Sequence, residues 1–534
     1  MNPRKITYAD KHVLLIESSG NMRATIVQML RQLGVVNIKP VTVNARVLEI
    51  IQEDRFDIVL LGHNASDKVT GIQLLEEARY RNYMRPSTGW IFMTSDASQQ
   101  VILHAIDSNP DYLLTKPFTV EELKHRIDAL IVRKQLLKDV DEAVERGDLK
   151  TAVSACDQVS VTDPSYDFAQ RYKGRLLLQL KRADEALNLL QERYWQNSDK
   201  DTGLLIAQAL LALKQPEAAI QQLQELIENH PLLVPALDLL AQAYEMNGDL
   251  QQARDVLHEA TRKSPLGIPR QMELGRIATQ THTLNLAEGA FKRSIVLGRT
   301  SCYKSPEPYL RLANIRRLEM QDADKDKQIE LHNDLDALLN HAQFSFPKDE
   351  ALKVKSLLIR SQTYKDLGKQ VKADGLQREA EKLNSRLPEP IDLARESIVL
   401  SGDAVPVLEE VPEQTEAKTR VPYDEVLSDK MNRMAIRHYM AGKYAQAMRC
   451  LNMATEYNPT NEAAILNLAQ LYLEVARDQS DRREERVTMV KRFIKLSLKM
   501  PLSEIAQIRQ HELVDHLRKP IDSLPKGSLG VLLR

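Results

Sequence analysis

The chain has 534 residues, too many for one hydrophobic core, so we expect several domains or an extended repeat array. Its 73 Lys and Arg residues balance 74 Asp and Glu residues, which leaves no basic field for nucleic acid or an anionic membrane. No apolar run reaches the roughly 18 residues of a membrane-spanning helix, and residues 1–11 lack the apolar core of a secretory signal, so we expect a cytoplasmic protein. The dispersed cysteines fit a reducing compartment and are interpreted as packing residues, namely Cys156, Cys302 and Cys450.

Short apolar runs alternate with amphipathic helical stretches over residues 12–130, as in a parallel sheet covered on both faces. This pattern predicts a five-stranded flavodoxin-like α/β domain, with its functional crevice at the carboxyl ends of the strands. The five predicted strands are residues 13–17, 38–43, 57–62, 90–94 and 111–115.

The residues at the strand ends resemble those of a response-regulator receiver domain of the CheY type, most specifically in the segment LLTKPF with Thr94 upstream. The resemblance implies a pocket where an aspartate accepts a phosphoryl group beside a Mg²⁺ ion. Carried over by position, that pocket consists of Glu17, Ser18, Gly62, Asn64, Thr94 and Lys116.

The sequence departs from the receiver pattern where the chemistry occurs. Gly62 stands at the position of the phosphoacceptor and cannot form an acyl phosphate. Ser18 replaces one carboxylate of the acidic pair, so most oxygen ligands for Mg²⁺ are missing. We therefore expect no phosphorylation at the usual place, a Glu17–Lys116 ion pair instead, and one dominant conformation; His63 and Asp67, the alternative acceptors, are interpreted as solvated loop residues.

The receiver resemblance also implies a docking surface on its fourth and fifth helices and fifth strand. Tyr112 and Leu113 lie on or beside this surface, although both are equally compatible with a place in the core. The helix that begins at Val120 has no Gly or Pro before about Arg146, so we expect one continuous helix that joins the receiver rigidly to the first repeat.

Small residues recur in the middle of the chain at intervals of 34, 33, 34 and 34, at Ala152, Ala186, Ala219, Ala253 and Ala287. With the punctuation by proline at Pro164, Pro231 and Pro265, this pattern resembles tetratricopeptide (TPR) repeats, in which small residues let paired helices approach closely. The clear array covers 131–300, and weaker or degenerate repeats cover 301–384.

Residues 385–425 contain five prolines and a stretch without Lys or Arg, which predicts an acidic linker. An alternative is that this linker folds back as an extended strand into the groove of the array. Residues 426–534 again show TPR-like spacing, so the expected order is a pseudo-receiver at 1–130, the array, the linker and a C-terminal helical domain.

The TPR resemblance implies a concave groove that binds proteins through the first helix of each repeat. The groove residues transferred by position are Arg171, Arg175, Gln208, Gln242 and Arg276, and the arginines suit carboxylates of a partner peptide. The sequence shows no combination of a nucleophile, a base and an orienting group, so we do not expect an enzyme. His511 and His516 are too far apart for a helical zinc motif, and we expect no metal and no cofactor.

Together these features predict a bacterial response-regulator-like adaptor in a two-component phosphorelay, similar to VieB-like auxiliary proteins. Its partners would be a sensor histidine kinase or another response regulator at the receiver and effector proteins at the groove. A second copy of the chain could also bind the receiver surface and form a homodimer. The alternative is a TPR scaffold in which the receiver is only a dimerisation or structural module.

Overall fold

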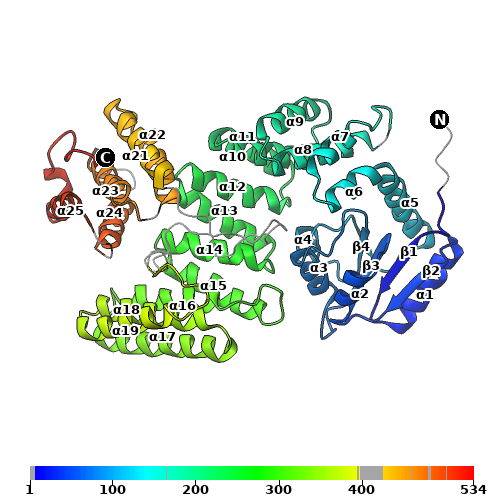
Figure 1. Cartoon of the computed structure of the whole chain (residues 1–534), viewed down its shortest axis with the longest axis horizontal. Helices are drawn as coiled ribbons and strands as arrows, with labels where there is room; N and C mark the ends of the chain where they lie inside the picture. The colour runs from blue at the N-terminus through cyan, green and yellow to red at the C-terminus, as the bar shows by residue number, and fades with distance from the viewer. Residues whose placement is uncertain are drawn as a thin grey trace. The chain divides into compact units, whose positions relative to one another are not determined.

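The computed structural model in Figure 1 describes residues 6–163, 165–393, 396, 425–458, 460–478, 483–498, 500 and 502–533. Most of the predicted acidic linker lies outside these residues, and so does the hypothesis that it occupies the groove. The described chain divides into two compact units. The first contains 1–245, 251–271 and 296–304, and the second contains 246–250, 272–295 and 305–534.

The N-terminal domain is the predicted α/β fold. Its parallel strands lie in the order β2-β1-β3-β4-β5 and span His12–Ile16 (β1), Asn37–Val41 (β2), Ile58–His63 (β3), Gly89–Thr94 (β4) and Tyr112–Thr115 (β5). The helices are α1 (Gly20–Gln32), α2 (Val47–Glu53), α3 (Gly71–Tyr80), α4 (Gln99–Asp107) and α5 (Val120–Leu136). The flavodoxin-like prediction is therefore confirmed.

Two apolar clusters, one on each face of the sheet, hold this domain together. One cluster packs α2, α3 and α4 against residues such as Trp90 and Phe92 of β4. The other packs α1 and α5 against residues such as Leu15 and Ile91. Because both faces are buried, the central strands are apolar at successive positions instead of alternating.

Capping boxes fix where α3 and α5 begin. The Thr70 hydroxyl accepts a hydrogen bond from the Gln73 amide, and Gln73 Oε1 accepts one from the Thr70 amide. Thr119 and Glu122 repeat this arrangement at the start of α5. These reciprocal bonds satisfy backbone donors that a helix start leaves unpaired.

The predicted continuous helix from Val120 to Arg146 is wrong. The structure has two helices, α5 and α6 (Lys138–Glu145), separated at Leu137. Leu137 is 1% exposed, and the Lys134 side chain donates a hydrogen bond to the Pro86 carbonyl. Packing of this junction, not a helix-breaking residue, bends the chain away from one axis.

The described residues that follow the receiver form helices, many of which pack against the next helix along the chain (Figure 1). In the N-terminal and central part they are α6 with α7 (Leu149–Cys156), α8 (Tyr166–Gln179), α9 (Ala183–Asn197), α10 (Lys200–Ala212), α11 (Pro216–Asn229), α12 (Val234–Met246), α13 (Leu250–Lys263), α14 (Ile268–Gln280) and α15 (Leu284–Gly298). The following helices are α16 (Glu307–Glu319), α17 (Lys325–Ser345), α18 (Glu350–Asp366) and α19 (Gln370–Asn384). The last group is α21 (Glu425–Met440), α22 (Tyr444–Tyr457), α23 (Glu462–Asp478), α24 (Arg483–Ser497), α25 (Glu504–Leu517) and the short 3₁₀ turn η1 (Ile521–Ser523).

The recurring small residues lie where helices touch. All five alanines of the 34-residue pattern, Ala152, Ala186, Ala219, Ala253 and Ala287, are fully buried. At Gly275 a Cβ atom would lie 2.4 Å from the Phe291 ring. Larger residues at these positions would push the helices apart, which explains the period that the sequence displays.

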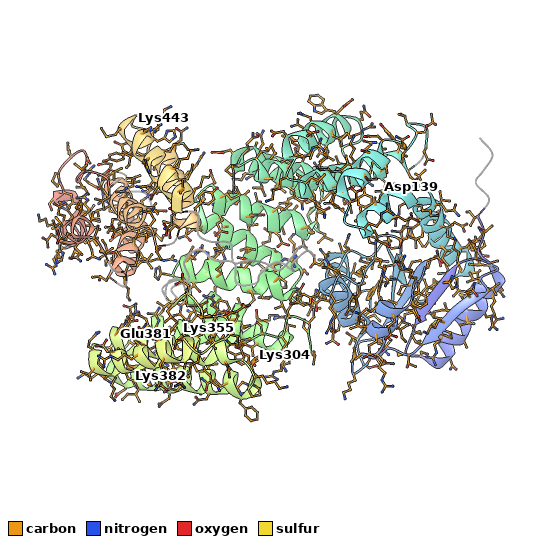
Figure 2. The ribbon with its side chains drawn as sticks, in the orientation of Figure 1. Asp139, Lys304, Lys355, Glu381, Lys382 and Lys443 are labelled. Carbon is orange, nitrogen blue, oxygen red and sulfur yellow. The ribbon has the colours of Figure 1, made fainter. Side chains whose placement is uncertain are left out.

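The beginning of the predicted linker packs against the degenerate repeats. Leu387, Ile391 and Leu393 contact the apolar cluster of α16 to α19. Lys355 of α18, labelled in Figure 2, pairs with Glu307 at 2.7 Å and with Glu396 at 3.4 Å. Residues 385–393 therefore extend the helical layer within the second unit.

Candidate functional site

The carboxyl ends of the central strands bring Glu17, Gly62 and Lys116 together. Ile16 pairs with Leu61 in the sheet register, so Glu17 and Gly62 follow on neighbouring strands. Glu17 is 2% exposed, and Lys116 Nζ lies 3.0 Å from its Oε2. The predicted ion pair is present.

Glu17 is held from several sides. Its Oε1 accepts hydrogen bonds from the Ser19 amide at 3.0 Å and from the Ser18 hydroxyl at 3.5 Å. Its carbonyl accepts one from Arg23 at 2.6 Å. These contacts hold the buried side chain in place, because its carboxyl oxygens find donors that replace water.

The space beside Gly62 is closed. A Cβ atom built there would lie 2.3 Å from Glu17 Oε2, and one built on Gly71 would lie 2.1 Å from the Gly62 carbonyl oxygen. The contact at Gly71 is with backbone and excludes a larger residue there, whereas a larger residue at position 62 would have to displace the Glu17 side chain. The predicted pocket is therefore filled by the Glu17 side chain and by the backbone that leads into α3.

The other predicted pocket residues bond locally. Thr94 is buried, and its hydroxyl accepts from the Asp96 amide at 3.0 Å and donates to the Asp96 carbonyl at 3.3 Å. Asn64 is exposed and holds its own loop, since its Oδ1 accepts from the amide and the hydroxyl of Ser66. The structure thus assembles Glu17, Gly62 and Lys116, while Asn64 turns to its own loop.

The interpretation of His63 as a solvated loop residue is wrong. His63 is the last residue of β3, is buried, and packs against Phe92 with ring centroids 5.7 Å apart and the ring planes tilted by 31°. Its Nδ1 accepts from the Ile72 amide at 3.3 Å. Burial lowers the pKa of His63, so the ring serves as a neutral spacer between β3 and α3.

The predicted docking residues lie at the sheet edge and are half-buried. The Tyr112 ring lies under the guanidinium groups of Arg126 at 5.2 Å and Arg133 at 5.7 Å. Leu113 packs at the margin of the apolar cluster on the α3 and α4 side of the sheet. Tyr112 is thus engaged with cationic side chains of α5.

The α4 part of the predicted docking surface is covered by repeat helices of the same compact unit. Leu103 of α4 packs in an apolar cluster with Val234 and Leu237 of α12 and Ala260 of α13. Gln99 donates a hydrogen bond to the Lys263 carbonyl at 3.5 Å. This surface of the receiver therefore already has an intramolecular partner.

One arginine joins the receiver to the repeats. Arg270 of α14 is 7% exposed in its side chain and contacts two carboxylates, Asp107 of α4 at 3.1 Å and Asp238 of α12 at 2.6 Å. The Ser264 hydroxyl also donates to Asp107 at 3.1 Å. Burial would lower the pKa of Arg270, but the two aspartates outweigh it and the pKa is raised. Residues 163 positions apart cannot be paired from one sequence.

A second contact connects α3 and α4 to the loop between α15 and α16. The buried Glu76 carboxyl lies 3.5 Å from His104 Nε2 and accepts from the Ser301 hydroxyl at 3.0 Å. Tyr303 packs edge-on against Tyr80, with centroids 5.0 Å apart. Desolvation raises the pKa of Glu76 to about 7 and lowers that of His104, so this contact is sensitive to protons near neutral pH.

The predicted groove residues of the array divide into two groups. Arg175, Gln208 and Gln242 are exposed on α8, α10 and α12. Arg171 and Arg276 instead form ion pairs within their own units, Arg171 with Asp199 at 2.7 Å and Arg276 with Glu273 at 2.7 Å. Asp238, which lies on the same helix as Gln242, is used by Arg270. The role of the five residues in binding a partner stays a prediction.

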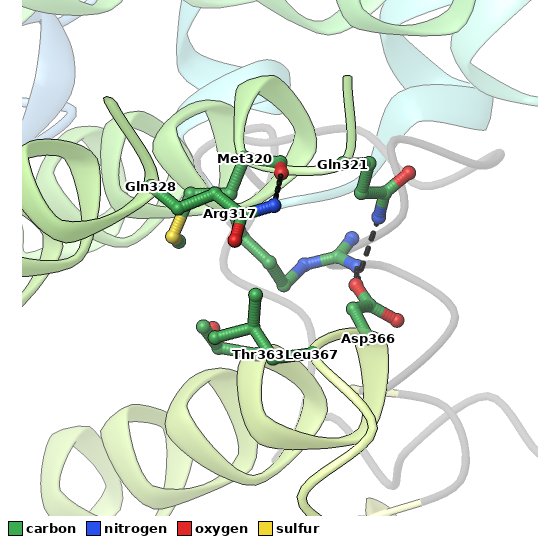
Figure 3. Close-up of a pocket in the computed structure, with 7 residues that line it drawn as sticks. All are labelled: Arg317, Met320, Gln321, Gln328, Thr363, Asp366 and Leu367. Carbon is green, nitrogen blue, oxygen red and sulfur yellow. Dashed lines mark hydrogen bonds and ion pairs between the residues drawn. The ribbon is translucent and has the colours of Figure 1, made fainter. Parts of the chain in front are cut away.

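A small hollow of about 190 Å³ lies among α16, α17 and α18 (Figure 3). Its buried Arg317 pairs with Asp366, and Gln321 Nε2 donates to the same carboxylate at 2.8 Å. Gln328 Nε2 donates to the Met320 carbonyl at 3.0 Å. These polar groups satisfy one another, so the hollow is a structural ion-pair site.

Comparison with known families fits these two kinds of architecture. Residues 13–128 match the response regulator receiver domain, and residues 204–268 match the tetratricopeptide repeat. The chain thus joins a CheY-like receiver to TPR helices, two modules that generally mediate protein–protein interactions. Among the described helices none is long and apolar enough to cross a bilayer.

The relatives with curated descriptions cover the receiver alone. The chain is 26% identical over 121 residues to the chemotaxis protein CheY of Pseudomonas aeruginosa, across 23% of this chain and 96% of that protein. It is 25% identical to the chemotaxis protein CheY-3 of Vibrio cholerae, across 23% of this chain and 92% of the relative.

Two solved structures resemble one part each. A CheY-like receiver from Methanospirillum hungatei has a TM-score of 0.21 and 21% identity, and covers 23% of this chain and 96% of its own. A TPR protein from Cytophaga hutchinsonii has a TM-score of 0.38 and 13% identity, and covers 48% of this chain and 98% of its own.

Proposed function

We propose that this protein is a phosphorylation-independent, response-regulator-like adaptor in two-component signalling. Its receiver binds a sensor histidine kinase or another response regulator, its repeat helices bind effector proteins, and it has no catalytic activity of its own. The observation that carries the proposal is Gly62, closed in by the Glu17–Lys116 pair.

Phosphoryl transfer to a receiver requires a carboxylate and oxygen ligands for Mg²⁺. Gly62 supplies neither, and the one carboxylate beside it, Glu17, is neutralised by Lys116. Without a change in charge, no ligand of this pocket favours one receiver conformation over another. The receiver therefore serves as a docking module with one conformation.

Phosphorylation independence is tested on the full-length protein with acetyl phosphate and Mg²⁺. We expect intact-mass spectrometry to find no phosphoryl adduct, whereas a receiver with an aspartate acceptor gains one under the same conditions. A hydroxylamine-labile phosphoryl group on the protein would overturn this part of the proposal.

The adaptor role is tested by affinity purification of the full-length protein from its native cell, followed by kinase assays with the purified partner. The expected result is a sensor kinase or response regulator among the retained proteins and a change in kinase autophosphorylation or phosphotransfer when the protein is added. Binding that leaves both rates unchanged contradicts the role.

The covered α4 surface supports a second candidate, a scaffold in which the receiver is a structural module. Arg270→Ala separates the two because it removes the ion pairs to Asp107 and Asp238. An adaptor whose α4 surface is covered by the repeats binds its signalling partner more tightly after this change, because the surface becomes exposed. A scaffold retains the same several partners and only loses stability.

A further inference from the structure

A segment of the chain lies extended along the last repeat helices. Residues 525–533, here called the groove segment, follow η1 and contact α21, α23 and α25, the first helices of the C-terminal repeats. Side chains of these helices bond mainly to its backbone. All of these residues belong to the second compact unit.

Two asparagines hold one end of the groove segment. Asn467 Oδ1 accepts from the Leu533 amide at 2.7 Å, and its Nδ2 donates to the Leu533 carbonyl at 2.7 Å. Asn432 Nδ2 donates to the same carbonyl at 3.0 Å. Both asparagines are buried, and Asn467 Nδ2 also donates to Asn432 Oδ1 at 2.9 Å.

The middle of the groove segment is held in the same way. Gln470 Nε2 donates to the Gly530 carbonyl at 2.8 Å, and Glu474 Oε1 accepts from the Leu529 amide at 2.7 Å. Arg509 Nη1 donates to the Leu529 carbonyl at 3.3 Å. Buried polar groups are costly without partners, so this row of side chains is explained by the backbone that it binds.

The side chains of the groove segment define a short pattern. Leu529 and Leu532 are buried in the apolar cluster of the C-terminal helices, whereas Val531 is 87% exposed. A Cβ atom on Gly530 would lie 2.1 Å from Arg509 Nη1. Arg509 is bonded to Glu512 and Gln470, so making room for a Cβ atom would disturb these bonds. The site therefore fits Leu-Gly-x-Leu, with x unrestricted.

We propose that the groove of α21, α23 and α25 is a peptide-binding site for an extended partner segment of the pattern Leu-Gly-x-Leu, and that residues 529–532 occupy it in competition with that partner. This goes beyond the adaptor function, because it assigns a second binding site, its ligand chemistry and its competitor. The main-chain bonds and two leucines that hold the groove segment are available to any chain with this pattern.

The groove segment can be displaced because it joins α25 through residues 518–524, most of which are exposed. A tethered segment acts at an effective concentration in the millimolar range. A partner segment therefore binds the intact protein weakly and a protein with a displaced groove segment strongly.

The test uses a fluorescent peptide of residues 526–533 and fluorescence polarisation with three full-length proteins. These are the wild type, Gly530→Ala, which expels the groove segment by the contact with Arg509, and Val531→Ala as the matched control. We expect Gly530→Ala to bind the peptide at least about tenfold more tightly than the other two. A peptide with alanine in place of glycine should not bind.

A second variant keeps the proposal falsifiable if Gly530→Ala does not fold. In a chain that stops after Lys526, the peptide should bind and raise the unfolding temperature, and adding Asn467→Ala should weaken binding about tenfold or more through two lost hydrogen bonds.

Three results would overturn the proposal. The first is a folded Gly530→Ala or shortened protein that does not bind the peptide. The second is unfolding of both variants that the peptide cannot rescue, since the segment is then a permanent part of the core. The third is a wild-type dimer that Gly530→Ala converts to a monomer, because the occupant is then a second copy of this chain.

Discussion

The receiver pocket and the groove of the C-terminal helices are both lined with buried polar groups, and both are occupied by the chain itself. In the pocket, the bonded side chains Glu17 and Lys116 follow strands β1 and β5 of one sheet. In the groove, the partner is the backbone of residues 525–533, which lies just after a short turn. The comparison teaches that burial alone does not tell whether the group that fills a site can be displaced by a partner. What matters is how that group is connected to the rest of the chain.

The largest effect is expected at the pocket. Lys116→Met leaves the Glu17 carboxylate buried and unpaired, which should destabilise the receiver by about 3 to 5 kcal/mol. Urea denaturation measures the loss, and Lys68→Met, at an exposed lysine, is the control. Combining Lys116→Met with Glu17→Gln should restore most of the stability. A loss below about 1 kcal/mol would mean that water solvates the pocket.

A smaller effect is expected at the groove. Asn467→Ala removes the partners of both the amide and the carbonyl of Leu533, at about 2 kcal/mol. If the groove segment is exchangeable, hydrogen exchange should accelerate at residues 529–533 while the helices stay protected. Equal acceleration throughout α21 to α25 would make the groove as permanent as the pocket. Gln507→Ala, at an exposed position of α25, is the control.

The contact between receiver and repeats gives a pH-dependent case. The pKa of Glu76 is raised to about 7, so its contribution to stability is complete below the usual carboxyl pKa and is lost as the pH rises through about 7. Wild-type stability should therefore fall by about 1 kcal/mol between pH 6 and pH 8, and Glu76→Gln should remove this dependence. Burial keeps His104 neutral over this range, because its lowered pKa affects stability only as the pH falls further. Thermal unfolding at both pH values checks the prediction, and an unchanged slope in Glu76→Gln would contradict it.

The smallest effect concerns the exposed groove residues of the array. Gln208→Ala and Gln242→Ala should change stability by less than about 0.5 kcal/mol, because neither side chain is buried. Any loss of effector binding in these variants, measured by calorimetry, would therefore report recognition and not folding. A large loss of stability would show that these residues support the array instead.

Much of the fold could be predicted from local patterns. The strand runs and the 34-residue spacing of alanines both reappear in the structure. The break at Leu137 could not, because no Gly or Pro marks it and packing of the junction produces it. The prediction for His63 is wrong because β3 ends one residue later than the sequence pattern indicates, which changes a loop position into a buried strand position.

The sequence by itself determined the missing acceptor at Gly62, the retained Lys116 and the repeat period, since each is a property of residue type and spacing. Only the tertiary structure decided that Arg270 joins Asp107 to Asp238, that Glu76 meets His104 and Ser301, and that residues 525–533 lie on Asn432 and Asn467. The physical reason is that these contacts join residues far apart in the chain. Their pairing depends on how successive helices stack, and no local propensity encodes that geometry.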